Sequence, residues 1–207
     1  FMAIIIFLAI RYKATDRQQQ DLQDSFWELE AQANATPPVN LDNLDYITIP
    51  LEKFPLGFSQ DDAILQMEAQ LLELSEKPML NLTGKTNTDL KISYGVPNLD
   101  KMIEIGENFD TLTILLKDYA QALLEQKMIA EAMVVLEFGA GIGTDISQHY
   151  VMLGECYKHL NKTDKIQLLI DKISLSNLLL GPSIIRQLND IMENDTSSIE
   201  QPEDFHL

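Results

Sequence analysis

A 34-residue repeat between Thr113 and Leu180 constrains the fold of this 207-residue chain more than any other feature of its sequence. Seven positions of one unit each have an apolar or small counterpart 34 residues later. These pairs are Leu116/Tyr150, Tyr119/Leu153, Ala120/Gly154, Leu123/Tyr157, Ala132/Ile166, Leu136/Ile170 and Gly139/Ile173. A period of this length indicates supersecondary units that stack and bury a continuous core together.

The second unit begins with the string YVMLGECY over 150–157, which has the pattern Y-x2-L-G-x2-Y. This string resembles the first helix of the tetratricopeptide repeat, whose 34-residue unit is a pair of helices. The resemblance implies an all-α fold in which helical hairpins form a short α-solenoid. It also implies that Gly154, like Ala120 in the first unit, lets the paired helix approach closely. The chain departs from the family at Ile166, where alanine is usual, and at Thr144, where proline is usual.

Further helices are expected to complete the core, because two units alone rarely make a stable solenoid. They are predicted at Ser59–Lys77, at Asn98–Asn108 and, as a C-terminal cap, over 182–194. Ser59 is the expected N-cap of the first of these helices. The apolar face of that helix is predicted to comprise Ile64, Met67, Leu71 and Leu74.

Repeat arrays of this type usually present a concave groove that holds a segment of a partner protein. The resemblance places five candidate partner-binding residues on the groove side of the first helices. They are Lys117, Gln121, Glu155, Lys158 and His159. One sub-family clamps the C-terminal carboxylate of chaperones with Lys and Asn in this groove. Lys117 fits that pattern, whereas Gln121 and Glu155 depart from it and argue against an acidic tail as the ligand.

The glycine-rich stretch VVLEFGAGIGTD over 134–145 also resembles the first motif of S-adenosylmethionine-dependent methyltransferases. That motif requires a parallel sheet continuing after the loop, yet the residues on both sides are predicted to be helical. The repeat instead makes this stretch the end of a helix, with Gly139, Gly141 and Gly143 at its C-terminus. Thr144, Asp145 or Ser147 is then expected to cap the next helix. A methyltransferase-like enzyme that uses residues 139–143 and a purely structural spacer remain the alternatives.

Charge and residue counts exclude several classes of function. The chain carries 32 acidic and 15 basic side chains, a net charge of -17, which repels phosphate backbones and argues against nucleic-acid binding. Its single cysteine, Cys156, offers neither a disulfide framework nor a zinc cluster and is expected to be a buried thiol. His149, His159 and His206 provide no pair of ligands on one helical face. We therefore expect no catalytic residue, no metal and no cofactor.

The N-terminal run FMAIIIFLAI, Phe1–Ile10, carries no charge and predicts a membrane anchor. Ten helical residues span about 15 Å, half of a bilayer core, so the run is interpreted as the end of a longer single-pass segment. Arg11, Lys13 and Arg17 come directly after it, and basic flanks favour the cytoplasmic side for the domain that lies C-terminal to the anchor. The expected location is the cell membrane.

The remaining boundaries are set by local patterns. Residues 11–57 are predicted to hold a juxtamembrane helix and an extended linker that docks on the helical domain at 58–194. The stripe expected on the juxtamembrane helix comprises Leu22, Phe26, Leu29 and Ala33. The docking residues expected in the linker are Ile47, Ile49, Leu51 and Phe54.

The polar stretch 78–97 is predicted to be an ordered loop. Its TGKT string lacks the upstream glycine of a phosphate-binding loop, since Met79 takes that position. An acidic disordered tail is expected at 195–207.

Overall fold

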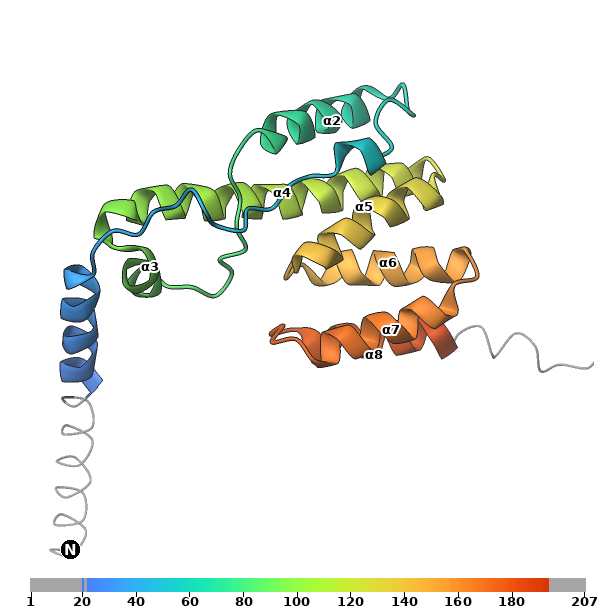
Figure 1. Ribbon diagram of the computed structural model, residues 1–207. Coiled ribbons are helices and arrows are strands. Elements are labelled where there is room, and N and C mark those ends of the chain that lie inside the picture. Colours follow the sequence, from blue (N-terminus) through green and yellow to red (C-terminus); the bar gives the residue numbers. More distant parts are fainter. Residues whose placement is uncertain (1–19, 21, 194–207) are drawn as a thin grey trace, which may run out of the picture. The chain divides into compact units, whose positions relative to one another are not determined.

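The computed structural model describes residue 20 and residues 22–193, and this part of the chain is all helical, with no strand (Figure 1). The predicted all-α class is therefore confirmed. The predicted anchor at 1–10 and the predicted tail at 195–207 lie outside the described residues. Among the residues that the structure does describe, no helix is both long enough and apolar enough to span a membrane.

The chain divides into two compact units. One contains the described residues up to Asp45 together with 84–104, and the other contains 46–83 together with the described residues from Ile105 onwards. Residues 46–57 thus belong to the second unit, although their sequence predicts a linker. Ile49 and Phe54 of this segment are buried, and Ile47 N–H donates to Met79 O at 2.9 Å. The segment docks as expected, and its docking makes it part of the helical core.

The first unit contains a helix over 22–35, α3 (Asn87–Tyr94) and the short 3-10 helix η2 (Val96–Asn98). Glu30 accepts hydrogen bonds from Thr88 Oγ1 and, at 2.8 Å, from Lys91 Nζ. Of the stripe predicted on the first helix only Ala33 is buried. The other three members, Leu22, Phe26 and Leu29, are exposed.

The stretch 78–97 is not the continuous loop that the sequence predicted, because α3 occupies its second half. Thr86 and Asp89 form a capping box: Thr86 Oγ1 accepts from Asp89 N, and the Asp89 carboxylate accepts from Thr86 N at 2.8 Å. This reciprocal pair satisfies two free N–H groups and starts the helix. The first half of the stretch is ordered by its own side chains, as expected, since Asn81 Oδ1 accepts from Thr83 N at 3.1 Å.

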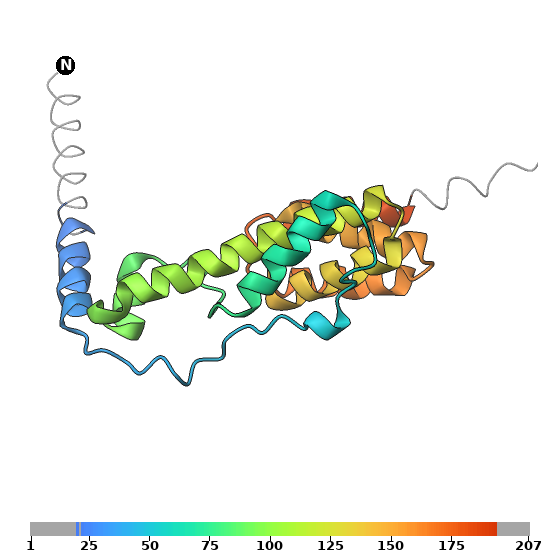
Figure 2. The ribbon, with the colours of Figure 1, turned by 90° about the horizontal axis from the view of Figure 1, so that it is seen from above.

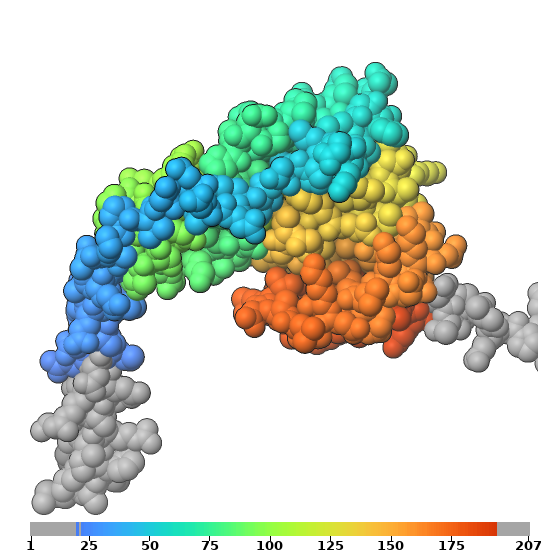
Figure 3. Space-filling model, viewed as in Figure 1, coloured from blue at the N-terminus to red at the C-terminus, as the bar shows by residue number. Residues whose placement is uncertain are grey.

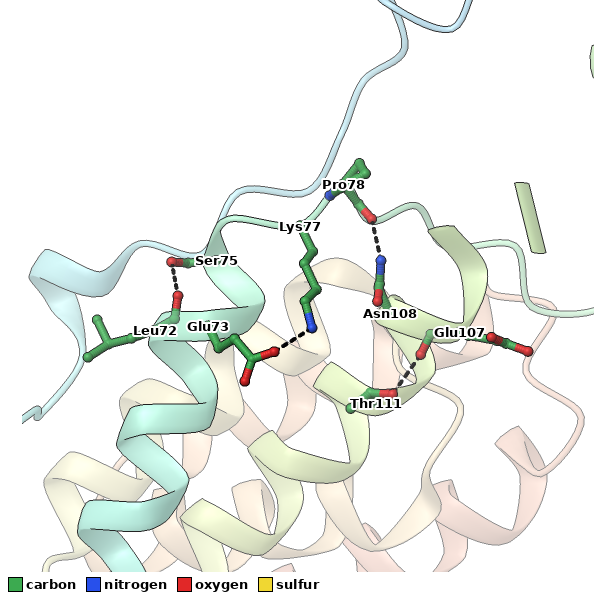
Figure 4. Close-up of polar contacts among 8 residues, drawn as sticks. All are labelled: Leu72, Glu73, Ser75, Lys77, Pro78, Glu107, Asn108 and Thr111. Carbon is green, nitrogen blue, oxygen red and sulfur yellow. Dashed lines mark hydrogen bonds and ion pairs between the residues drawn. The ribbon is translucent and has the colours of Figure 1, made fainter. Parts of the chain in front are cut away.

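In the second unit, η1 (Leu51–Lys53) precedes α2 (Asp62–Ser75). The N-cap of α2 is Asp61, which accepts from two backbone N–H groups, rather than the predicted Ser59. Ser59 instead donates to Gln126 Oε1 at 2.8 Å, a long-range contact that sequence cannot reveal. Beyond α2, Asn108 Nδ2 donates to Pro78 O at 3.1 Å and ties the chain to α4 (Leu99–Glu125) (Figure 4).

Helix α4 corrects the prediction of a separate helix at Asn98–Asn108, because it runs unbroken for 27 residues. No proline interrupts this stretch, so nothing forces the helix to end there. Four shorter helices come after it: α5 (Ile129–Ile142), α6 (Ser147–His159), α7 (Thr163–Ser174) and α8 (Gly181–Glu193). They stack in chain order, α6 on α5 and then α7 and α8 on α6 (Figures 1 and 2).

The boundaries of these helices repeat with the period found in the sequence. Each of three boundaries recurs 34 residues later. The pairs are Glu125/His159 for helix ends, and Ile129/Thr163 and Ser147/Gly181 for helix starts. Helix α8 therefore begins where the first helix of a third unit would begin.

The turn inside each helix pair also repeats. Lys127 and Asn161, 34 residues apart, are the two described non-glycine residues with positive φ, at 62° and 54°. The next residue closes each turn in the same way, with Met128 N–H donating to Leu123 O at 2.9 Å and Lys162 N–H donating to Tyr157 O at 2.7 Å. The repeat thus extends from residue types to backbone conformation.

All fourteen residues of the seven repeat pairs are buried. Another helix approaches Gly154 closely, as expected. That helix is α8, however, and not α7, the second helix of the same pair. A Cβ atom at Gly154 would overlap Leu188 Cδ2, which occupies the equivalent position one period later. The glycine therefore lets successive first helices of the array meet.

Candidate functional site

The three glycines at the end of α5 occupy three different environments. Gly139 lies inside the helix and faces the His149 ring, where a Cβ atom would overlap Cε1 and Nε2. Gly141 faces open space. Gly143 is the C-cap, with φ 79°, and its N–H donates to Gly139 O. The predicted helix end is confirmed, although only Gly143 adopts the left-handed conformation that favours glycine there.

Two side chains that are distant in sequence donate hydrogen bonds to the carbonyls at the C-terminal end of α5. Asn81 Nδ2 donates to Ile142 O at 3.1 Å and to Gly143 O at 2.9 Å. Lys172 Nζ, from the last turn of α7, donates to Ala140 O at 2.9 Å. Carbonyls at a helix C-terminus lack partners within the helix, and these donors replace the missing ones.

The next helix begins without the predicted side-chain cap. Neither Thr144, Asp145 nor Ser147 caps α6, whose N-cap position is Ile146. Thr144 Oγ1 accepts instead from Ile146 N at 3.2 Å, and Thr144 O accepts from Tyr150 Oη at 2.6 Å. These bonds leave the Asp145 carboxylate at the surface.

A pocket of about 270 Å³ opens at this helix end. We call it the α5-end pocket. Three segments line it: the 81–83 loop, residues 140–150, and the end of α7 with the turn after it. Its lining residues are Asn81, Thr83, Ala140, Gly141, Gly143, Asp145, Tyr150, Lys172, Ile173, Ser176, Asn177 and Leu178.

The lining of the α5-end pocket carries one carboxylate, that of Asp145. Partial burial and the charges of Asp145 and Glu107 raise the pKa of Asp110. Burial and the Asp145 charge also raise the pKa of Tyr150 to about 12. The negative end of the α5 dipole lies here too, and the Asn81 and Lys172 donors meet it. Lys172 is the basic residue of the lining, and its Nζ is bonded to Ala140 O.

Solvent-exposed leucines border the α5-end pocket. Leu175 is 89% exposed and Leu179 is 93% exposed, on the turn between α7 and α8 that also supplies Leu178 to the lining. This turn lies at the edge of the unit, in the orange part of the surface in Figure 3. Nearly complete exposure of two large apolar side chains beside a pocket is typical of a binding surface.

His149 and Cys156 on α6 are buried, as is typical of structural rather than reactive groups. His149 Nε2 lies 3.0 Å from Leu136 O, and Nδ1 has no hydrogen-bond partner among the described residues. Burial lowers the pKa of His149 to about 4 and outweighs the Leu136 hydrogen bond, which raises that pKa. The ring is therefore neutral near pH 7. Burial, and to a lesser extent Glu155, raises the pKa of Cys156 to about 11, which leaves a thiol rather than the nucleophilic thiolate.

Of the two candidate groove residues on α4, Gln121 lies near α2. Gln121 lines a cleft of about 480 Å³ between α2 and α4, together with Asp61, Asp118 and Glu125. Its Nε2 donates to Glu125 Oε1 at 3.3 Å. Lys117 pairs with the neighbouring Asp118 carboxylate.

The three candidates on α6 lie in a different place. Lys158 Nζ donates to Ile191 O at 2.9 Å and thereby caps the end of α8. Glu155 and His159 are exposed. Gln121 thus lines the cleft beside α2, whereas Lys158 contacts α8. Neither that cleft nor the α5-end pocket contains candidates from both α4 and α6.

The sequence singled out Gly141, Gly143, Asp145, Tyr150 and Ile173 of the α5-end pocket, but it did not point to Asn81, Lys172 or the turn residues 176–178. Asn81 and Lys172 reach it from 61 and 32 residues away along the chain. The sequence held one indication of this surface, the leucine-rich run SLSNLLLG over 174–181 at the end of the predicted repeat. None of its leucines belongs to the seven repeat pairs.

The chain was compared with protein-family models, curated proteins and solved structures, and none of these comparisons gives a match.

Proposed function

We propose that this chain is a membrane-anchored helical-repeat module of the tetratricopeptide type that binds a protein partner and performs no catalysis. The recurring helix boundaries and the recurring turn at Lys127 and Asn161 support the helical-hairpin array. The run Phe1–Ile10 supports the anchor, with the basic residues after it favouring the cytoplasmic side.

The main support for a binding function is the exposure of the leucines on the turn between α7 and α8. Several large apolar side chains of this unit are exposed, and Leu175 and Leu179 are the most exposed among them. A solvent-exposed leucine gains about 1.5–3 kcal/mol when it is fully buried, so a pair of them favours association with another surface. The α5-end pocket beside them offers a place for a partner's side chain.

The alternative of a methyltransferase-like enzyme is disfavoured by the backbone that leads into Gly139. That segment is α5, and the described residues contain no strand from which a cofactor loop could start. Isothermal titration calorimetry of the full chain with S-adenosylmethionine tests the alternative. Micromolar binding would reverse our preference.

Co-purification tests the binding function. The full chain, solubilised in detergent, serves as bait, and bound proteins are quantified by mass spectrometry. A Leu175→Ser/Leu179→Ser variant is expected to lose a partner at least about fivefold, since hot-spot truncations cost more than about 1 kcal/mol. The matched control is Leu65→Ser/Leu72→Ser, which changes two exposed leucines of α2. Identical protein sets for all three baits would contradict the proposal.

A further inference from the structure

We propose that the exposed apolar stripe of the first helix pairs this chain with a second copy of itself, as a short parallel coiled coil. The stripe comprises Leu22, Phe26 and Leu29, on the helix drawn in blue in Figure 1, and is called the 22–29 stripe below. This inference goes beyond the binding of a partner at the leucine turn. Of the proposed function it uses only the anchor.

The 22–29 stripe is open to solvent in the part of the chain that the structure describes. Leu22 is 65% exposed, Phe26 51% and Leu29 43%, and every residue from 22 to 29 is exposed. Ala33, one turn further along the same side, is the buried residue of this helix. Isolated helices of about 12–15 residues are marginal in water, and packing of an apolar face is what stabilises them. The stripe therefore needs cover from outside its own unit.

The spacing of the stripe is that of a coiled coil. Leu22, Phe26 and Leu29 follow one another at intervals of four and three residues, which are the d, a and d positions of a heptad, and Ala33 continues the pattern. In a parallel pair each of these side chains meets its counterpart on the second copy. One stripe thus supplies both halves of the interface, as a twofold-symmetric contact requires.

The charges of the helix allow a second copy to approach, although the chain as a whole carries -17 and copies of it repel one another. Asp24 and Glu28 take the outer positions f and c of the same heptad, away from the stripe. The carboxylate of Glu30, beside the stripe, is paired with Lys91 Nζ at 2.8 Å. The other positions beside the stripe are uncharged: Gln23, Ser25 and Gln32. Pairing along the stripe therefore brings no two unpaired carboxylates together.

A shared membrane favours a second copy over the other occupants of the stripe. Anchors in one bilayer, formed by the run Phe1–Ile10, give two copies the same orientation and raise their effective concentration. This gain matters because a coiled coil of fewer than two heptads is weak in free solution. The bilayer surface itself is a less favourable occupant, since Asp24 and Glu28 would approach its anionic headgroups.

Disulfide cross-linking tests the pairing. The one cysteine of the chain, Cys156, is buried, so a cysteine introduced into the first helix is the accessible thiol. The full chain is reconstituted at low density in phosphatidylcholine vesicles and oxidised mildly. The single substitutions are Leu22→Cys, Phe26→Cys and Leu29→Cys in the stripe, and Asp24→Cys and Glu28→Cys outside it. We expect the stripe positions to form covalent dimers at least about tenfold faster, because a disulfide requires Cβ atoms about 4 Å apart.

Two further changes on the same helix separate the stripe from exposed apolar surface in general. In the Leu22→Cys background, Phe26→Ser/Leu29→Ser should slow cross-linking at least about fivefold, since it removes the remaining anchors of the interface. Trp27→Ser is the matched control, because Trp27 is 60% exposed but takes the outer position b. It should leave the rate as it is.

The remaining outcomes would overturn the inference. Equal rates at stripe and outer positions, or no covalent dimer at any of them, would exclude the pairing. Dimers from Phe26→Cys alone, at the centre of the stripe, would indicate an antiparallel pair. Adducts with a different protein, when the same variants are oxidised in cells, would identify that protein as the occupant. Strong quenching of Trp27, the single tryptophan, by brominated lipid tails would identify the bilayer surface instead. None of these results bears on the partner at the leucine turn.

Discussion

Gly139 on α5 and His149 on α6 fit together so closely that no side chain can be added between them. A Cβ atom at Gly139 would overlap ring atoms of His149, whose side chain is fully buried. The ring also contacts the preceding turn of α5, since its Nε2 lies 3.0 Å from Leu136 O. The glycine is thus required by packing between helices rather than by a cofactor.

Two alanine substitutions in the same helix should therefore have opposite effects. Gly139→Ala is expected to lower the free energy of unfolding by about 1–3 kcal/mol, because the ring has to move and lose its contact with Leu136. Gly141→Ala faces open space and should leave that free energy unchanged or raise it by up to about 1 kcal/mol, as the helix propensity of alanine predicts.

Urea unfolding followed by circular dichroism measures both variants. Equal stability of Gly139→Ala and Gly141→Ala would show that α5 and α6 do not meet as described. A cofactor loop would respond differently, losing ligand binding in both variants without this contrast in stability.

The packing of α6 on α8 gives a second prediction. A leucine at Gly154 would be forced into Leu188, so Gly154→Leu should lower the free energy of unfolding by about 1–3 kcal/mol or more. The companion change Leu188→Ala makes room for it and should recover part of the loss in the double variant. Additive effects of the two changes would contradict direct contact.

The buried imidazole of His149 makes stability depend on pH. Its pKa is about 4 in the folded protein, against about 6.5 in an unfolded chain, and burial is the cause. The unfolded chain therefore takes up the proton first as the pH falls. The contribution of the neutral ring is fully present above pH 6.5 and is lost progressively as the pH falls to about 4, by up to about 3 kcal/mol.

Comparison with a variant isolates this contribution from that of the carboxylates. His149→Gln should flatten the fall in the free energy of unfolding between pH 6.5 and 4, whatever its stability at pH 7. His159→Gln, at the exposed end of the same helix, should leave the slope as it is. An unchanged slope in His149→Gln would exclude the buried neutral ring.

The predicted anchor is tested by removing it. A chain that begins at Asp21 should leave the membrane fraction and stay in aqueous buffer, because its net charge opposes association. It should also keep cooperative melting, since the buried residues of α2 and α4–α8 form their own core. Aggregation or loss of cooperative melting would mean that the run Phe1–Ile10 packs in the core.

The sequence predicted the parts of this fold that depend on local pattern. The 34-residue period predicted which fourteen residues are buried, because each lies on the inner face of a helix whose position the period sets. The apolar face of α2 was also predicted: Ile64, Leu71 and Leu74 are buried, and Met67 is partly buried against the core.

One local feature and several that depend on distant contacts were not predicted. The capping box of Thr86 and Asp89 was present in the sequence but was obscured by the polar residues around it, so α3 was assigned to a loop. Asn81 and Lys172 meet the end of α5 only after the chain has folded. For the same reason the candidate Lys158 turned out to cap α8.

Site-specific photo-crosslinking tests the central claim, that this module holds a protein partner at its leucine turn, most directly. Benzoylphenylalanine is placed at Leu179 or, as the control, at the exposed Leu72 of α2, in the full chain in intact cells. We predict a discrete adduct with one protein from position 179, which Leu175→Ser weakens, and none from position 72. The account is contradicted if position 179 gives no adduct, or if both positions give the same one.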